Sequence, residues 1–204
     1  MRPLLGGRVY QYELEGWNIV WESRGNYRHW CTQTHERFDR HVLVVMKNPG
    51  SLRGDGTDLR RDTTLRILRD VGRETKCSWH IVNLFDFAAA RSDELYSNWS
   101  RRDGRALVYR KIRTRNFCGV LFAHGDSPKD FQTAYQKRIA FVRTTFKALP
   151  EIQIPTTKAG NPVHPMNWQR NGLVSCVRQS IRGHFSSGSV ASRIKPTRSP
   201  DGEH

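Results

Sequence analysis

The sequence has few cysteines, few acidic residues and no long apolar run, and each shortage excludes a class of protein. Its four cysteines, Cys31, Cys77, Cys118 and Cys176, are far apart, so no CxxC pair exists for a zinc, iron–sulfur or redox site. Dispersed thiols are typical of a reducing cytoplasm. No run approaches the roughly 18 apolar residues that a membrane span needs, and residues 1–7 lack the apolar stretch of a signal peptide. We therefore expect a cytoplasmic protein that needs no membrane, metal or cofactor.

The shortage of acids leaves a large positive charge. Aspartate and glutamate number 19 against 34 lysines and arginines, which gives a formal net charge of +15 and a pI of about 10.3. Such an excess predicts an anionic partner, and DNA is the favoured one, with phage DNA that carries modified bases as a special case. The alternative is a basic protein without a polyanionic partner. The sequence does not indicate an oligomeric state.

The order of apolar segments predicts one α/β domain over residues 1–185 and a flexible basic tail over residues 186–204. Residues 8–40 alternate aromatic and charged side chains, which favours short antiparallel strands before the main sheet. Helices then alternate with apolar strands, so we expect a three-layer α/β/α sandwich around a central, mostly parallel four-stranded sheet. The four strands are predicted at about residues 41–46, 79–84, 117–123 and 152–156.

Polar residues follow each predicted strand, where a ligand would bind in such a sheet. Asn48-Pro49-Gly50 follows the first strand, in a turn whose glycine lets the backbone approach a ligand closely. Asn83 and Phe85 follow the second; the amide can read a base edge and the ring can stack on it. An asparagine that caps a loop and a core phenylalanine are the alternative. His124 follows the third strand as a wall of the same site.

The loop after the fourth strand carries His164 between two prolines, as expected of a rigidly held catalytic imidazole, although a rigid surface loop has the same pattern. Lys158 in this loop is a candidate phosphate contact. Asp62 precedes a helical stripe and has the chemistry of an N-cap. Asp62 and Asp86 are also alternative catalytic bases.

Basic and aromatic residues elsewhere are candidate DNA contacts. The arginine-rich stretch over residues 101–115 can track a phosphate backbone or form a solvated helix face. Trp168 can stack on a base or pack in the core. The candidate DNA-binding residues are Lys158, Arg53, Arg101, Arg102, Arg105 and Trp168.

Taken together, these motifs resemble a bacterial and phage family designated domain of unknown function 1643. Its pattern reads NPS, DPTIRR, NLF, WG-x-HG and TK-x-G-x-P-x-HP. The corresponding segments here are residues 48–50, 62–66, 83–85, 122–125 and 157–165. The chain departs from the pattern with glycine at position 50, threonine at position 63 and Phe122-Ala123 in place of Trp-Gly.

Three of these segments are also similar to motifs of uracil-DNA glycosylases. That resemblance implies a uracil-DNA-glycosylase-like fold and hydrolysis of the N-glycosidic bond of a flipped-out uracil or modified pyrimidine, which leaves an abasic site. It implies Asn48 and His164 as catalytic residues. The implied base-binding residues are Asn83, Phe85, Pro49, Gly50 and His124.

A modified phage base as the target would give the protein a role in antiviral defence. Two other functions stay open. One is a non-catalytic module that binds nucleic acid or a modified base, and the other is an enzyme that acts on free nucleosides or nucleotides.

Overall fold

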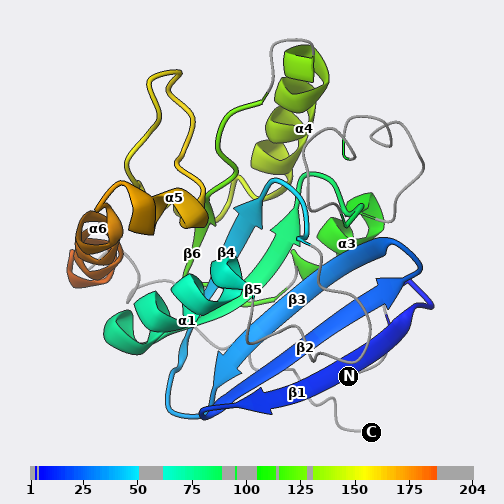
Figure 1. The fold of residues 1–204 in the computed structure, drawn as a ribbon, viewed down its shortest axis with the longest axis horizontal. Coiled ribbons are helices and arrows are strands. Elements are labelled where there is room, and N and C mark those ends of the chain that lie inside the picture. The colour runs from blue at the N-terminus through cyan, green and yellow to red at the C-terminus, as the bar shows by residue number, and fades with distance from the viewer. Residues whose placement is uncertain are drawn as a thin grey trace, which may run out of the picture.

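A six-stranded mixed sheet forms the centre of the molecule (Figure 1). The computed structural model describes residues 3, 5–50, 62–88, 95, 105–113, 115–127 and 131–187. The strands are β1 (Arg8–Leu14), β2 (Trp17–Arg24), β3 (Tyr27–His35), β4 (Arg40–Met46), β5 (Cys77–Asn83) and β6 (Gly119–Phe122). They are ordered β1-β2-β3-β5-β4-β6. The pairs β1–β2, β2–β3 and β3–β5 are antiparallel, whereas β4–β5 and β4–β6 are parallel.

The expected three-layer α/β/α sandwich around a mostly parallel four-stranded sheet, of the uracil-DNA-glycosylase type, is wrong. Residues 8–40 form strands of 7, 8 and 9 residues that join the main sheet through β3 instead of preceding it. They do so because β2 and β3 bury side chains on both faces. Residues 152–156 form no described strand. Isolated bridges from Val120 to Glu151 and from Thr156 to Pro162 flank this segment, because the prolines at 150 and 155 have no N–H for a ladder.

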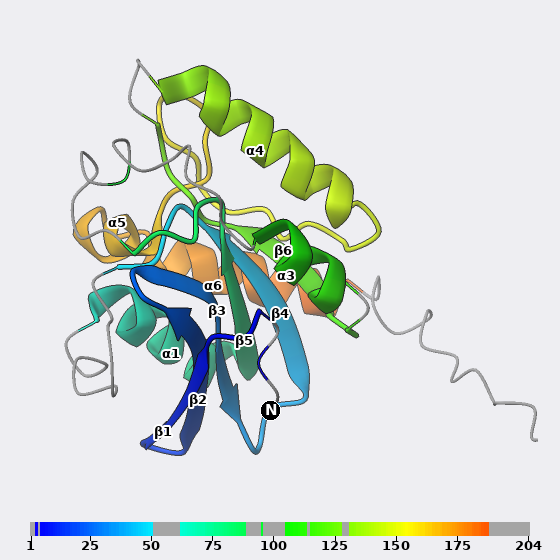
Figure 2. The ribbon, with the colours of Figure 1, turned by 90° about the vertical axis from the view of Figure 1, so that its right-hand side faces the viewer.

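Helices cover both faces of this sheet (Figure 2). The helices are α1 (Thr63–Thr75), α3 (Arg105–Ile112), α4 (Gln132–Thr145), α5 (Pro165–Arg170) and α6 (Val174–Ser186). Buried residues of α1, α5 and α6 cluster with Val42 and Val44 of β4, whereas those of α3 and α4 cluster with Leu43 and Val45. Successive residues of a strand point to opposite faces. β4 therefore contributes to two apolar cores.

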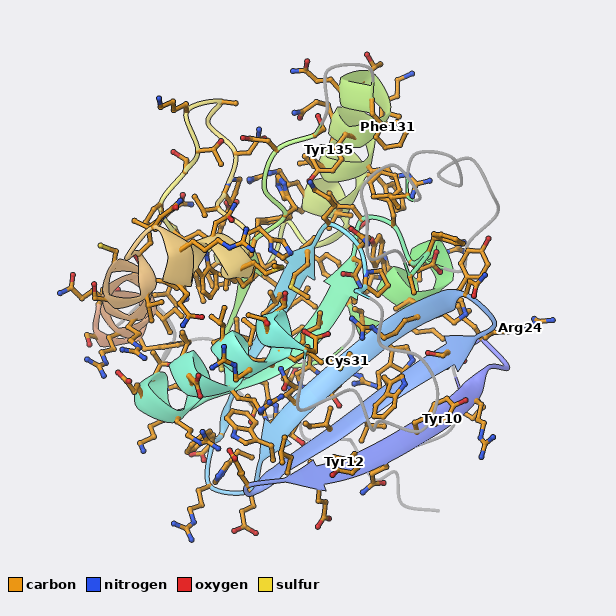
Figure 3. The ribbon with its side chains drawn as sticks, viewed as in Figure 1. Tyr10, Tyr12, Arg24, Cys31, Phe131 and Tyr135 are labelled. Carbon is orange, nitrogen blue, oxygen red and sulfur yellow. The ribbon has the colours of Figure 1, made fainter. Side chains whose placement is uncertain are left out.

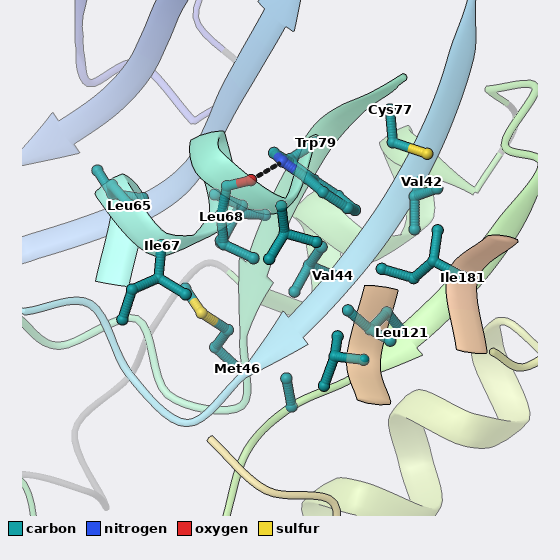
Figure 4. Packing of buried hydrophobic residues seen from close by; sticks show 14 of the residues in the cluster. Val42, Val44, Met46, Leu65, Ile67, Leu68, Cys77, Trp79, Leu121 and Ile181 are labelled. Carbon is teal, nitrogen blue, oxygen red and sulfur yellow. Dashed lines mark hydrogen bonds between the residues drawn. The ribbon is translucent and has the colours of Figure 1, made fainter. Parts of the chain in front are cut away.

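The core under α1 positions the start of that helix (Figure 4). Trp79 Nε1 on β5 donates a hydrogen bond of 2.6 Å to Leu68 O. Gly72 lies so close to the sheet that a Cβ built there would come within 2.7 Å of Cys77 O. At the other end of the helix, Asp62 is the N-cap, and its Oδ1 accepts a hydrogen bond of 2.9 Å from the Leu65 N–H. This packing fixes Asp62 at the edge of the sheet where β4 and β5 end.

No helix in the described part of the chain is long and apolar enough to cross a membrane. Helix α6 ends at Ser186, and residues 188–204 of the predicted tail lie outside the described residues. The division into one domain and a tail stays a prediction.

Candidate functional site

The polar residues that follow the parallel strands lie at one edge of the sheet. Met46, the last residue of β4, pairs in register with Asn83, the last residue of β5. The ladder continues beyond the strands, because the Leu84 N–H donates to Met46 O and the Ala123 N–H donates to Val45 O, both at 2.8 Å. The segments that follow Met46, Asn83 and Phe122 therefore leave the sheet side by side.

His164 reaches this edge of the sheet from a segment far along the sequence. It is the N-cap of α5, and its Nδ1 accepts a hydrogen bond of 3.3 Å from the Met166 N–H. Gly125 lies directly against it: a Cβ built on Gly125, whose φ is +68°, would be 3.3 Å from His164 Cβ. The Gly125 N–H donates to Pro162 O at 2.8 Å. The loop before α5 is thus fastened to the end of β6.

The chemistry of His164 follows from this placement. Burial, together with smaller effects of the neighbouring Lys47 and His124, lowers its pKa to about 4. The imidazole is therefore neutral at pH 7. Because Nδ1 accepts the cap hydrogen bond, the ring proton resides on Nε2. His164 is a fixed, neutral hydrogen-bond donor.

His124 is buried at the end of β6, with 1% of its surface exposed. Its Nδ1 lies 2.9 Å from Gly125 O, so we assign the proton to Nδ1. Tyr135 of α4 (Figure 3) donates to the carbonyls of His124 and Gly125, at 2.9 and 3.0 Å. Burial lowers the pKa of His124. Within the described residues, Nε2 of His124 has no hydrogen-bond partner, so it can accept one from a ligand.

Asp126 ties three segments together around the site. Its carbonyl accepts a 2.6 Å hydrogen bond from Lys47 Nζ. Its Oδ1 accepts from Thr157 Oγ1 at 2.7 Å and from Asn161 Nδ2 at 2.6 Å. Burial lowers the pKa of Lys47, which Asp126 partly opposes. Lys158, the predicted phosphate contact, is exposed in the loop that Asp126 holds through Thr157 and Asn161.

The Asn48-Pro49-Gly50 turn lies between Lys47 and the start of α1. The amide nitrogen of Asn48 donates to Pro49 O at 2.8 Å, which fixes how the amide is turned. A Cβ built on Gly50 would lie 3.7 Å from Asp62 Oδ2. The cap of α1 uses Asp62 Oδ1, so Oδ2 faces the turn. Of the two alternative bases, Asp62 is the one beside Asn48.

Asp86, the other alternative base, is buried and paired with His29 of β3. The Nδ1–H of His29 donates to Asp86 Oδ2 at 2.7 Å. Sequence reasoning missed His29, Tyr135 and Asp126. His29 belongs to a region expected outside the main sheet, and neither Tyr135 nor Asp126 stands in one of the motifs. The only signal for Asp126 was its position directly after a predicted strand.

Asn83 and Phe85 differ in their surroundings. Asn83 is 2% exposed, and among described residues its Oδ1 has no hydrogen-bond partner. Its carbonyl accepts a hydrogen bond from Tyr109 of α3. Phe85 is 1% exposed, stacks on Tyr135 and carries the Arg138 guanidinium 4.0 Å from its ring centre. The structure thus gives Phe85 a packing role instead of the predicted stacking on a base.

The predicted DNA contacts are placed unevenly. Trp168 has no exposed surface, and its Nε1 donates to Val163 O at 2.8 Å, so it packs in the core and does not face DNA. Arg53, Arg101 and Arg102 lie outside the described residues. Arg105 is the first residue of α3, and its side chain is outside the described part as well. Among described residues, no group of three or more His, Cys, Asp or Glu side chains is arranged to hold a metal ion.

Comparison with known proteins identifies the family. Residues 27–166 match the model of the family described as "Protein of unknown function (DUF1643)". The chain belongs to this family. No curated protein sequence matches it. The similarity to uracil-DNA glycosylase motifs stays a prediction.

One solved structure with some likeness is a Bacteroides fragilis NCTC 9343 protein, named as a candidate acetyl xylan esterase. Its sequence identity is 9% and the TM-score is 0.36, over 88% of this chain and 66% of that protein. A likeness of this size carries no argument about activity.

Proposed function

We propose that this protein hydrolyses the N-glycosidic bond of a nucleotide flipped out of DNA, in the cytoplasm. The observation that carries the proposal is His164, a neutral imidazole whose Nε2–H is fixed as a donor at the ends of the parallel strands. A departing pyrimidine develops negative charge on its ring and carbonyl oxygens. A preorganised donor that stabilises this charge lowers the barrier without transferring a proton.

In this proposal the attacking water binds beside the turn formed by residues 48–50. Asn48 orients the water, and Asp62 Oδ2, which faces the same turn, takes its proton. The water oxygen bonds to C1′ of the sugar while the C1′–N bond breaks, and the electron pair of that bond leaves with the base. The sugar passes through an oxocarbenium-like state, as in glycoside hydrolysis. The products are a free base and an abasic site.

Asn83 reads the base edge in this scheme. A buried amide oxygen without a partner among the described residues is costly unless a ligand supplies a donor. The N3–H of uracil and the exocyclic amine of a cytosine derivative are such donors. In this proposal the substrate is a pyrimidine, either uracil or a modified base of phage DNA. The charge of +15 supports DNA over a free nucleoside as the carrier of that base.

The test is base release from a panel of DNAs. Purified protein is incubated with unmodified DNA, with uracil-containing DNA and with phage DNA that carries modified cytosines. Abasic sites and released bases are then measured. We expect release from one of the last two substrates and none from unmodified DNA.

Two variants at one position separate catalysis from folding. His164→Ser keeps a side-chain acceptor for the N-cap of α5 but removes the Nε2–H donor. We expect wild-type thermal stability and at least a hundredfold loss of base release. His164→Ala should lose the cap as well, at about 1 kcal/mol. Full DNA binding with no release from any substrate would instead favour a non-catalytic module that binds a modified base.

A further inference from the structure

The lysine between β4 and the turn at Asn48 has no role in the proposed hydrolysis. Lys47 is half-buried, and its Nζ donates a 2.6 Å hydrogen bond to the main-chain carbonyl of Asp126. The carboxylate of Asp126 is engaged elsewhere, because its Oδ1 accepts hydrogen bonds from Thr157 and Asn161. Within the described residues, the amine of Lys47 is thus bonded to a carbonyl and not to a carboxylate.

The amine of Lys47 lies at the same edge of the sheet as His164. Asp126, whose carbonyl it contacts, directly follows Gly125 in the chain, and a Cβ built on Gly125 would lie 3.3 Å from His164 Cβ. Lys47 Nζ also lies 5.8 Å from the ring centre of Tyr135, whose hydroxyl donates to Gly125 O at 3.0 Å. The amine therefore lies close to the imidazole that acts on the departing base in the proposed reaction.

The surroundings of this amine favour its uncharged form. Burial lowers the pKa of Lys47, although the charge of Asp126 opposes that shift. Lys47 in turn contributes to the lowered pKa of both His164 and His124, as expected of a positive charge near two imidazoles. An amine must lose a proton before it attacks a carbonyl carbon, so a lowered pKa raises the fraction that reacts at neutral pH.

We propose that Lys47 captures an abasic site of DNA as a Schiff base. This assignment rests on the proposed function for its substrate class, because the ring-opened deoxyribose of an abasic site carries an aldehyde at C1′. The lone pair of the neutral amine attacks C1′, two protons from nitrogen leave with the aldehyde oxygen as water, and a C=N bond replaces the C=O bond. Addition of water reverses the step and frees the lysine. Until then the reactive aldehyde stays on the protein.

Reductive trapping tests the assignment on an abasic site that is prepared beforehand. Sodium cyanoborohydride reduces an imine to a stable amine, so a Schiff base becomes a permanent protein–DNA adduct that is visible on a denaturing gel. We expect the wild-type protein to form this adduct with an abasic oligonucleotide and not with its tetrahydrofuran analogue, which has no aldehyde. Mass spectrometry of the digested adduct should place the DNA on Lys47.

Two arginine variants separate the chemistry of the amine from its charge. Lys47→Arg keeps a positive charge and a donor for Asp126 O, but a guanidinium stays protonated and forms no imine. We expect it to bind the abasic oligonucleotide like the wild type and to form at least about tenfold less adduct. Lys137→Arg makes the same change at an exposed lysine of α4 and should leave the yield of adduct unchanged.

Failure of this assignment is distinguishable from failure of the proposed hydrolysis. His164→Ser should still form the adduct on the prepared abasic site, although it loses base release in that proposal. Trapping by the wild type without base release from any DNA would overturn the hydrolysis alone. An adduct of wild-type yield in Lys47→Arg, an adduct that maps to a different amine, or no adduct from the wild-type protein would each overturn the assignment.

Discussion

Single residues at the candidate site combine strain with close contact. Gly125 has a φ of +68° and lies against His164, whereas Gly160 has a φ of +80° with open space around it. A side chain is strained at either position. Only at position 125 does the new Cβ also press on the imidazole. The two glycines therefore separate backbone strain from displacement of the catalytic group.

We predict that Gly125→Ala and Gly160→Ala both lower stability, by about 1 kcal/mol or more. Only Gly125→Ala should also lower base release, by about ten- to a hundredfold, because small displacements of a catalytic group are expensive. Melting temperatures and single-turnover release rates check this. Equal activity of the two variants would show that His164 does not need its present position.

A second residue-scale prediction concerns pH. Burial, together with smaller effects of His41 and Arg115, lowers the pKa of His80 to about 3. The unfolded chain takes up this proton below about pH 6.5, but the folded protein does not. The stability contribution is thus fully present above pH 6.5 and is lost as the pH falls towards 3.

Between pH 7 and pH 5 this one group should cost about 2 kcal/mol of unfolding free energy. His164, with its pKa of about 4, adds a loss in the same direction. Denaturant unfolding of the wild type and of His80→Gln at both pH values measures the effect. The variant should lose less stability on acidification; an identical loss in the two proteins would refute the assignment.

At the scale of elements, α1 is held against β5 at a position where there is no room for a side chain. A Cβ on Gly72 would lie 2.7 Å from Cys77 O and equally close to the rings of Trp17 and Trp79. Gly183, in α6, has nothing within 4 Å. Both are helical glycines, so replacement by alanine gives the same gain in helix propensity at the two positions.

We predict opposite signs for the two alanine substitutions. Gly183→Ala should stabilise by about 0.5–1 kcal/mol through helix propensity. Gly72→Ala should destabilise by about 1–3 kcal/mol through overpacking. Chemical denaturation decides, and stabilisation by Gly72→Ala would mean that α1 does not pack on β5 as closely as described.

Element by element, local chemistry was readable from the sequence and sheet assembly was not. The cap at Asp62 followed from the pattern of polar and apolar residues. The polar exits at Asn48 and Asn83 followed from strand ends, whereas the strand expected before His164 is not among the described strands. Period-two alternation in residues 8–40 indicated strands but could not show that β3 pairs with β5, because register is set by contacts between distant segments.

The other residues of the site could not be predicted from the sequence for a related reason. His29 comes from β3, so its nearness to Asp86 depends on the antiparallel pairing of β3 with β5, which the sequence did not show. Phe85 and Trp168 were assigned to nucleic acid because aromatic rings serve both cores and bases. Burial decided that question, and sequence alone carries no direct measure of it.

At the scale of the whole molecule, the charge of +15 should dominate DNA affinity. We predict that binding to a single-stranded oligonucleotide weakens by about a hundredfold or more between 50 and 200 mM salt, through release of counterions. Fluorescence anisotropy over a salt series measures the slope. An affinity that hardly changes with salt would favour an enzyme of free nucleosides or nucleotides.

The central claim, that the site releases a pyrimidine base from DNA, is tested most directly by mass spectrometry of free bases after single-turnover incubation with uracil-containing and modified phage DNA. The account predicts one released pyrimidine, in equal amount to the abasic sites formed, from the wild-type protein. It predicts essentially none from His164→Ser at the same melting temperature. Release at wild-type rate by that variant, or no base from any DNA, would contradict the account.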